Sequence, residues 1–200
     1  MMPTFLCIRR QSSERRGNHE AGSDFCRSTG TAGVTAAGAA GRLVSLCRCR
    51  RAAGENVEAF SPEKDDTDIL LAAKYALSAG CSRLIFYGAL GGRLDHMVAN
   101  LQMLRFLADR NAQGILVDHA HWITLQRGGT ASYPRREGMY FSLFAMTERC
   151  EDVTLEGVAY PLCHGVFSNA FPLGVSNEIL AETAKVTVGK GDLLVMYAKD

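Results

Sequence analysis

Apolar residues recur at helical spacing in two stretches of the chain, and one short, continuously apolar run lies between them. The first stretch follows Ser61-Pro62-Glu63 and ends at Gly80, a residue type that often stops a helix. The run Arg83–Tyr87 predicts a buried strand, and Asp95–Arg110 predicts a second helix. The apolar positions are Ile69, Ala72, Ala73, Ala76 and Leu77 in the first helix, and Val98, Leu101, Leu104 (or Phe106) and Ala108 in the second.

Beyond the second helix the pattern is that of short strands. Gly114–Asp118 and His121–Leu125 predict two strands, and after Gly128-Gly129 the strand signals follow one another without a helix. Residues 189–191, Gly-Lys-Gly, separate two strand-like runs and predict the turn of a terminal hairpin. The later strand-like runs are Met139–Ala145, Val153–Leu155, Ala184–Val188 and Asp192–Tyr197.

This order of elements predicts an α/β fold class: a Rossmann-like α/β domain, incomplete or aberrant at its start, followed by a C-terminal all-β sandwich or barrel. We expect an atypical segment over residues 1–54, the α/β domain over 55–128 and the β-domain over 129–200. A helix–strand alternation supports the first domain, and many short strands without helices support the second.

The segment 1–54 differs from the rest of the chain in composition. It contains nine Arg, no Lys and four of the seven Cys, and its nine Arg against three acidic residues give a formal charge of +6. A Gly/Ala/Thr tract covers residues 29–41, and Arg42–Arg51 contains the one short strand-like run. A basic arm that binds nucleic acid is one interpretation. A disordered or artefactual segment is the other, and it is the one we favour.

The overall composition narrows the class of protein. With 47% hydrophobic and 22% charged residues, the chain can bury an ordinary core, and a net charge of +1 gives no reason to expect a nucleic-acid or membrane partner. No run approaches the roughly 18 apolar residues of a membrane-spanning helix, and Met1–Arg16 lacks an export signal. Seven cysteines without regular spacing favour the cytoplasm.

Chemistry-bearing residues gather first in Tyr87–His96, which reads Y-G-A-L-G-G-R-L-D-H. A glycine-rich turn between a strand and a helix can direct backbone N–H groups toward a phosphate. Arg93 adds a cation and Asp95 a carboxylate, while His96 could assist proton transfer or cap the helix. Glycines also simply end strands, but ligands in open α/β sheets bind beyond the carboxyl ends of strands, where this turn lies.

Two further segments are candidates. Lys64–Asp68 reads K-D-D-T-D, and the three-residue spacing of Asp65 and Asp68 predicts a shared helix face that could hold Mg²⁺. Acidic residues at a helix start also favour the helix dipole without any metal. Gly174–Glu178, G-V-S-N-E, consists of ordinary turn formers and by itself supports no functional claim.

Together these three segments, in this order, resemble the thiamine pyrophosphokinase (thiamine diphosphokinase) family. The resemblance covers about residue 57 to 200, with the motifs K-D-x-T-D at Lys64–Asp68, G-x-x-x-G-R-x-D-[HQ] at Gly88–His96, and S-N at Ser176-Asn177. It implies a Mg²⁺-dependent enzyme that converts ATP and thiamine to AMP and thiamine diphosphate. It also implies a catalytic nucleotide-binding domain, a thiamine-binding β-domain and a homodimer.

The resemblance also implies roles for particular residues. Tyr160 could add an aromatic face for thiamine, or it could belong to the core. The roles are catalysis for Asp65, Asp68 and Asp95, with Asp65 and Asp68 binding the metal; nucleotide binding for Gly88, Gly92, Arg93 and Thr67; and thiamine binding for Ser176, Asn177 and His96.

Residues 1–54 lack the A-D-G-G and G-D-F-D-S segments with which this family opens. An Arg-rich, Lys-free stretch joined abruptly to a good match suggests the hypothesis of a shifted reading frame, which translation of the DNA in the other two frames would test. The alternatives to an active kinase are an impaired remnant that binds thiamine or nucleotide without turnover, and a basic-armed nucleic-acid binder.

Overall fold

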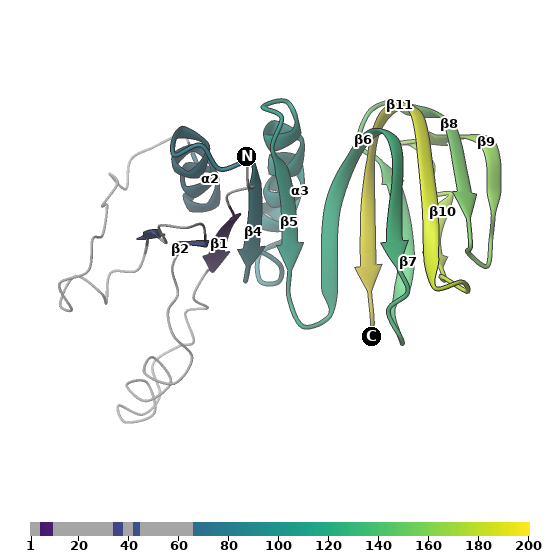
Figure 1. Cartoon of the computed structure of the whole chain (residues 1–200), viewed down its shortest axis with the longest axis horizontal. Helices are drawn as coiled ribbons and strands as arrows, with labels where there is room; N and C mark the ends of the chain where they lie inside the picture. The colour runs from purple at the N-terminus through teal and green to yellow at the C-terminus, as the bar shows by residue number, and fades with distance from the viewer. Residues whose placement is uncertain (1–4, 10–33, 38–41, 45–65) are drawn as a thin grey trace. The chain divides into compact units, whose positions relative to one another are not determined.

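The computed structural model describes residues 5–9, 34–37, 42–44 and 66–200 (Figure 1). The first three segments and Asp68 are described by their backbone alone. The chain divides into two compact units, residues 1–100 and 101–200. None of the described helices is long and apolar enough to cross a membrane.

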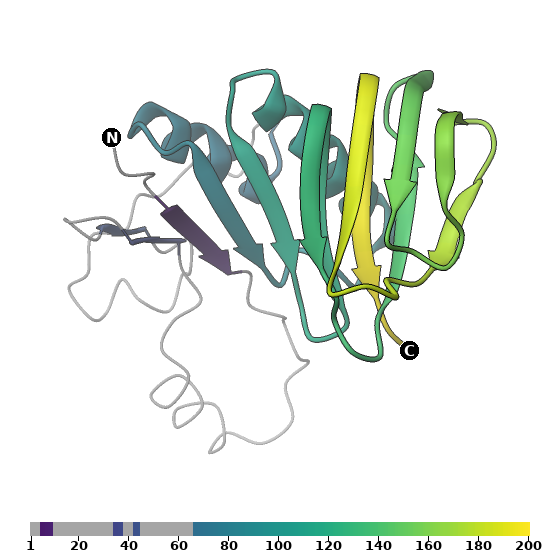
Figure 2. The same cartoon turned by 45° about the vertical axis from the view of Figure 1, so that its right-hand side comes forward.

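The first unit contains a small sheet whose central strands run in parallel. Strand β4 (Arg83–Tyr87) has the bounds predicted from the sequence and pairs in parallel with β1 (Phe5–Arg9) (Figure 2). Strand β1 also pairs antiparallel with β2 (Val34–Ala37), which pairs with β3 (Arg42–Val44). Strand β3 falls in the one strand-like run of residues 1–54, whereas β1 and β2 lack any periodic signal.

Helix α2 spans Asp68–Ser78 and begins at a side-chain cap. The hydroxyl oxygen of Thr67 accepts a hydrogen bond from the backbone N–H of Leu70 at 3.3 Å, which satisfies a donor of the first turn. Gly80 has φ +81°, a left-handed conformation that commonly closes helices, so the predicted stop is confirmed. The predicted start at residues 61–63 lies outside the described residues. Ile69, Ala72, Ala73 and Ala76 are buried, as predicted, whereas Leu77 of the same predicted face is only half-buried.

Helix α3 spans Leu94–Ala108, close to the predicted range, but its first turns bury a different face. Val98, which the apolar pattern places inside, is 47% exposed, whereas the Asn100 side chain is buried. An amide takes the inward position because it finds a hydrogen-bond acceptor there, as described below. The later turns bury Met103, Leu104 and Leu107.

The second unit is built on two long strands. Strand β5 (Gln113–Val117) forms a hairpin with β6 (His121–Pro134), and β6 pairs antiparallel with β11 (Thr183–Ala198) along almost its whole length. The two short strands predicted before Gly128 are therefore β5 and the first part of β6. Strand β6 continues through Gly128 and Gly129.

The predicted terminal hairpin is wrong, because β11 runs through residues 189–191 as one strand with a register shift between Val188 and Asp192. Gly191 has φ +104°, and a Cβ there would lie 2.6 Å from the carbonyl oxygen of Arg149 in the neighbouring strand. Glycine is therefore required by close backbone approach at a bulge, and not by a reversal of the chain.

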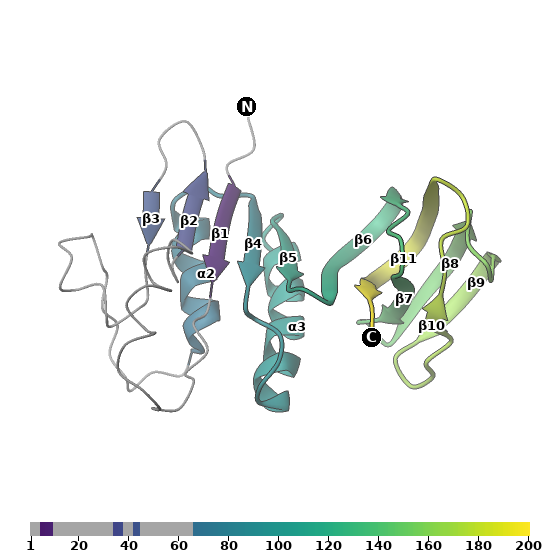
Figure 3. The ribbon, with the colours of Figure 1, turned by 90° about the horizontal axis from the view of Figure 1, so that it is seen from below.

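Shorter strands complete this unit on both sides of β11 (Figure 3). The N-terminal half of β11 pairs with β8 and its C-terminal half with β7, while β9 pairs with β8 and β10 with β7. The core is drawn mainly from β7, β8, β9 and β11 and includes Phe141, Val153, Phe167, Val186, Leu193 and Tyr197. The bounds are Tyr140–Ala145 for β7, Arg149–Glu156 for β8, Leu162–Ser168 for β9 and Gly174–Asn177 for β10.

Candidate active site

The glycine-rich turn lies between β4 and α3 in the first unit. Gly88, Gly91 and Gly92 have φ of +68°, +86° and +79°, in the region that residues with a Cβ rarely adopt. A Cβ added at Gly91 or Gly92 would meet no atom within 4 Å, so the outer side of the turn is open. The predicted turn is present in an open, glycine-dependent conformation, and its ligand stays a prediction.

Arg93 and Asp95 form an ion pair at the start of α3. The Nε of Arg93 donates to Oδ1 of Asp95 at 3.1 Å, and Nη2 contacts the other carboxylate oxygen. The same Oδ1 accepts the backbone N–H of His96 at 2.9 Å. The hydrogen bond from Arg93 lowers the pKa of Asp95, and Asp95 raises the pKa of Arg93. Both side chains are exposed, so either can turn toward a ligand.

Asn100 holds the glycine-rich turn from behind. Its side chain is only 3% exposed, and its Nδ2 donates to the carbonyl oxygen of Ala89 at 2.6 Å. Ala89 is itself buried, so this bond fixes the backbone between Gly88 and Gly91. The sequence pattern missed Asn100. The one feature that could have indicated it is an amide residue in a predicted helix, eleven residues after Ala89 of the glycine-rich turn.

The acidic segment before α2 is described in part. Asp65 and the side chain of Asp68 lie outside the described residues, so their role as metal ligands stays a prediction. Asp66 pairs with Lys74 at 2.6 Å. Thr67 uses its oxygen as the helix cap, which leaves its hydroxyl hydrogen available to a ligand. Within residues 66–200, no three His, Cys, Asp or Glu side chains gather as a metal site.

Ser176 and Asn177 lie in the second unit and differ in what they expose. Ser176 is exposed with φ +57°, and its backbone N–H donates to Oγ of Ser142 at 3.0 Å. The Asn177 side chain is buried: Oδ1 accepts the N–H groups of Tyr160 and Glu178 at 3.0 and 2.9 Å, and Nδ2 donates to the Tyr160 carbonyl at 3.0 Å. Only one N–H of this amide stays available to a ligand.

The structure thus brings together Gly88, Gly92, Arg93, Asp95 and His96 in the first unit, while Ser176 and Asn177 belong to the second. Tyr160 is 71% exposed, so the sandwich-core alternative for it is wrong. A glycine turn that follows a parallel strand and opens a helix defines a class of α/β proteins that bind phosphate-bearing ligands.

Comparison with known proteins refines this class. Residues 49–116 match the thiamin pyrophosphokinase catalytic domain, and residues 123–193 match the thiamin pyrophosphokinase vitamin B1 binding domain. The chain therefore belongs to the thiamin pyrophosphokinase family, whose reaction transfers a pyrophosphoryl group from ATP to thiamine. The sequence prediction of this family is confirmed.

Individual relatives agree with this assignment. The chain is 30% identical over 144 residues to thiamine pyrophosphokinase of Bacillus subtilis (strain 168), across 70% of this chain and 66% of that protein. The crystal structure of the Bacillus subtilis enzyme superposes with a TM-score of 0.70 at 28% identity, covering 76% of this chain and 71% of that one. The Geobacillus thermodenitrificans enzyme gives a TM-score of 0.67 at 28% identity, covering 76% and 70%.

Proposed function

We propose that this chain transfers the pyrophosphoryl group of ATP to the hydroxyl of thiamine, giving thiamine diphosphate and AMP. The observation that supports this proposal is the order of the candidate site residues along the chain. The open glycine turn with Arg93 and Asp95 lies in the range matched by the catalytic domain, and Ser176 lies in the range matched by the vitamin B1 binding domain.

The thiamine hydroxyl oxygen forms a bond to the β-phosphorus of ATP and gives up its proton, while the bond from that phosphorus to the AMP oxygen breaks and AMP leaves. Such a transfer depends mainly on positioning and on neutralising phosphate charge. Backbone N–H groups at Gly88 and Gly92 and the guanidinium of Arg93 are the donors suited to this. Asp95 has a lowered pKa and stays ionised near neutral pH, so it orients a donor group on the substrate and does not act as a general acid.

Magnesium fits the acidic segment by the chemistry of its donors. Mg²⁺ takes oxygen ligands, usually one or two carboxylates together with substrate phosphates. Asp65 and Asp68, three residues apart at the start of α2, are the carboxylates that would hold the ion. Bound there, Mg²⁺ would neutralise charge on the nucleotide phosphates.

We extend the proposal to a homodimer. Strand β10 pairs only with β7 among the described strands, so its other edge is open. Val175 lies in β10 and is 47% exposed. Leu173 and Phe171 precede the strand and are 49% and 65% exposed. An open apolar strand edge favours association with another chain, and a second copy would cover it.

A Rossmann-like first domain and a cytoplasmic location belong to the same proposal. The parallel pairing of β1 with β4, followed by the turn and α3, supports the Rossmann-like interpretation. In the described part of the chain the cysteines Cys81, Cys150 and Cys163 are free, which suits a reducing compartment.

The test is turnover by the purified chain with ATP, thiamine and Mg²⁺. We expect AMP and thiamine diphosphate to form in equal amounts, and a chelator to stop both. Arg93→Gln should raise the KM for ATP by about tenfold or more, because a charged phosphate contact is lost.

Arg110→Gln is the matched control, since it removes an exposed guanidinium just beyond the same helix and should leave the KM for ATP unchanged. Thiamine binding by calorimetry without any AMP release would contradict the proposal. That outcome would favour the alternative of an impaired remnant that binds substrate without turnover.

A further inference from the structure

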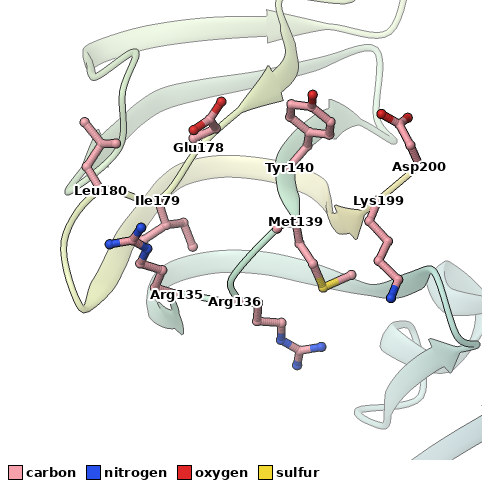
Figure 4. A pocket seen from close by; sticks show the side chains of 10 residues that line it. Arg135, Arg136, Met139, Tyr140, Glu178, Ile179, Leu180, Lys199 and Asp200 are labelled. Carbon is pink, nitrogen blue, oxygen red and sulfur yellow. The ribbon is translucent and has the colours of Figure 1, made fainter.

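A pocket of about 350 Å³ opens in the second unit, apart from the residues assigned above (Figure 4). It is lined by the segment between β6 and β7, by residues 178–180 after β10, and by the end of the chain after β11. Its volume is that of sites for small molecules. The sequence patterns gave no signal for it, because its lining comes from three separate segments.

Arg136 is a preorganised cation in this pocket. Its Cζ lies 4.5 Å from the ring centroid of Tyr197 and 4.9 Å from that of Trp122. Burial raises the pKa of Tyr197 to about 12, and the nearby charge of Arg136 opposes this shift. Stacking occupies the planar faces of a guanidinium and leaves its N–H edge available. No acceptor within residues 66–200 pairs with that edge.

The charges of the pocket are separated. In Figure 4 the charged ends of Arg136 and Lys199 point to one side, where the Met139 thioether also lies. The carboxylates of Glu178 and Asp200 point to the opposite side. Within residues 66–200, Lys199 has no ion-pair partner. The first side therefore presents two cations to an anion, while the second presents acceptors to an N–H donor or a positive group.

Apart from Arg135, whose charged end points away from the other two cations in Figure 4, the remaining lining is mainly apolar and suits a flat ring. Met139, Tyr140, Ile179 and Leu180 line the pocket, and Tyr140 and Leu180 are 40% and 60% exposed. Arginine and lysine bind phosphate through charge-assisted hydrogen bonds, while thioether and aromatic groups pack against rings.

We infer that this pocket binds a small phosphate ester of a nitrogen heterocycle, with its phosphate against Arg136 and Lys199 and its ring on Met139 and Tyr140. The binding does not depend on the transfer reaction. Two ligand sources share this chemistry: a nucleoside phosphate and a phosphorylated thiamine.

Trp122 reports on the pocket, because it is the only tryptophan of the chain and stacks with Arg136. We would titrate the full chain with inorganic pyrophosphate, AMP and thiamine diphosphate and follow tryptophan fluorescence. We expect a saturating change with a ring-bearing phosphate at lower concentration than with pyrophosphate. Tighter binding of AMP would identify the ligand as a nucleoside phosphate, and tighter binding of thiamine diphosphate would identify it as a phosphorylated thiamine. Either result supports the inference.

Lys199→Gln leaves the stacked Arg136 in place and should weaken the fluorescence response about tenfold, since one charged contact is lost. Arg136→Gln should weaken it at least as much. Arg149→Gln, which removes an exposed guanidinium elsewhere in the same unit, should not change it. Equal affinity of wild type and Lys199→Gln, or no saturating change with any of the three phosphates, would overturn the inference.

Arg93→Gln separates this site from the proposed transfer site. We expect this variant to lose turnover with ATP and keep the Trp122 response. A chain inactive in transfer that still shows the response supports the pocket alone. If Arg93→Gln abolishes the response, the signal comes from the transfer site and the inference fails.

Discussion

Asn100 lies on the buried face of α3, where helices usually carry a hydrophobic side chain. The amide is stable there because its Nδ2 finds the Ala89 carbonyl at 2.6 Å, and a buried amide without a partner would be costly. The bond ties the first turns of α3 to the backbone of the glycine turn. A single buried amide therefore sets the shape of the proposed phosphate site without facing its open side.

We expect Asn100→Ala to raise the KM for ATP by about three- to tenfold, because one hydrogen bond worth about 1 kcal/mol that holds the turn is lost. Thiamine affinity should stay the same. Steady-state kinetics and thiamine calorimetry are the measurements. Gln102→Ala, at an exposed position of the same helix, is the control. An unchanged KM for ATP in Asn100→Ala would show that the turn holds its shape without the amide.

Ser176 and Asn177 show what a two-residue motif leaves open. The sequence predicts both as thiamine contacts, and both roles stay predictions. The structure adds that the Asn177 amide already joins β10 to the backbone of Tyr160, whereas Ser176 faces outward at φ +57°. The irregular backbone at Ser176 leaves its side chain exposed while Asn177 is buried, so the motif combines a structural amide with an accessible hydroxyl.

Among the elements, β11 differs most from its expectation. Gly-Lys-Gly between two apolar runs is a common hairpin signal. Here β6 and β8 flank the segment and continue past it, so β11 keeps its direction and absorbs the extra residues as a bulge. Only the neighbouring strands decide between a turn and a bulge, because local residues favour both.

We expect Gly191→Ala to lower the free energy of unfolding by at least about 3 kcal/mol, because φ +104° and a contact 2.6 Å from the Arg149 carbonyl both oppose a Cβ. Gly129→Ala shares the positive φ, at +68°, but its Cβ would meet no atom within 4 Å. It should cost about 1–2 kcal/mol. Urea denaturation measures both. Equal losses would mean that the close approach to β8 relaxes.

Elements with strong local signals were predicted well. Strand β4 and the end of α2 follow from an apolar run and from Gly80, both of which act within a few residues. Strand β9 was missed because Leu162–Ser168 alternates weakly and leaves Cys163 and His164 exposed. Its pairing with β8 supplies the stability that its own pattern does not show.

At the scale of the whole molecule, the second unit is tied together by one buried carboxylate. Asp192 of β11 accepts Nε and Nη2 of Arg127 at 2.7 and 2.8 Å, and Arg105 of α3 lies 3.4 Å away. Arg127 also donates to Asp109 at 2.6 Å. The cluster joins the end of α3 to β6 and β11. The hydrogen bonds from Arg127 lower the pKa of Asp192.

The lowered pKa makes the stability of the protein sensitive to acid. This contribution is present above the ordinary carboxyl pKa of about 3.9 and is lost as pH falls through the lower folded-state pKa. Asp192→Asn should lower the free energy of unfolding by about 2 kcal/mol at neutral pH, less than for a fully buried pair because Arg127 is 42% exposed. Below about pH 4 the difference in unfolding free energy between Asp192→Asn and wild type should become smaller, because the wild-type carboxylate is then protonated.

Denaturant unfolding at several pH values measures this effect. Glu137→Gln removes an exposed carboxylate of the same unit that has no ion pair within residues 66–200, and it should behave as wild type. A constant difference between Asp192→Asn and wild type from neutral to acid pH would contradict the role of the Asp192 charge.

The sequence by itself determined the family, the order of the motifs and the elements with strong local signals. These depend on residue types and spacings that neighbours in the chain fix. Tertiary structure alone decided the inward face of α3, the continuity of β11, the burial of the Asn177 amide and the pocket around Arg136. Each of these depends on contacts between residues far apart in sequence, where the available hydrogen-bond partners and space select one of several conformations that the local sequence allows.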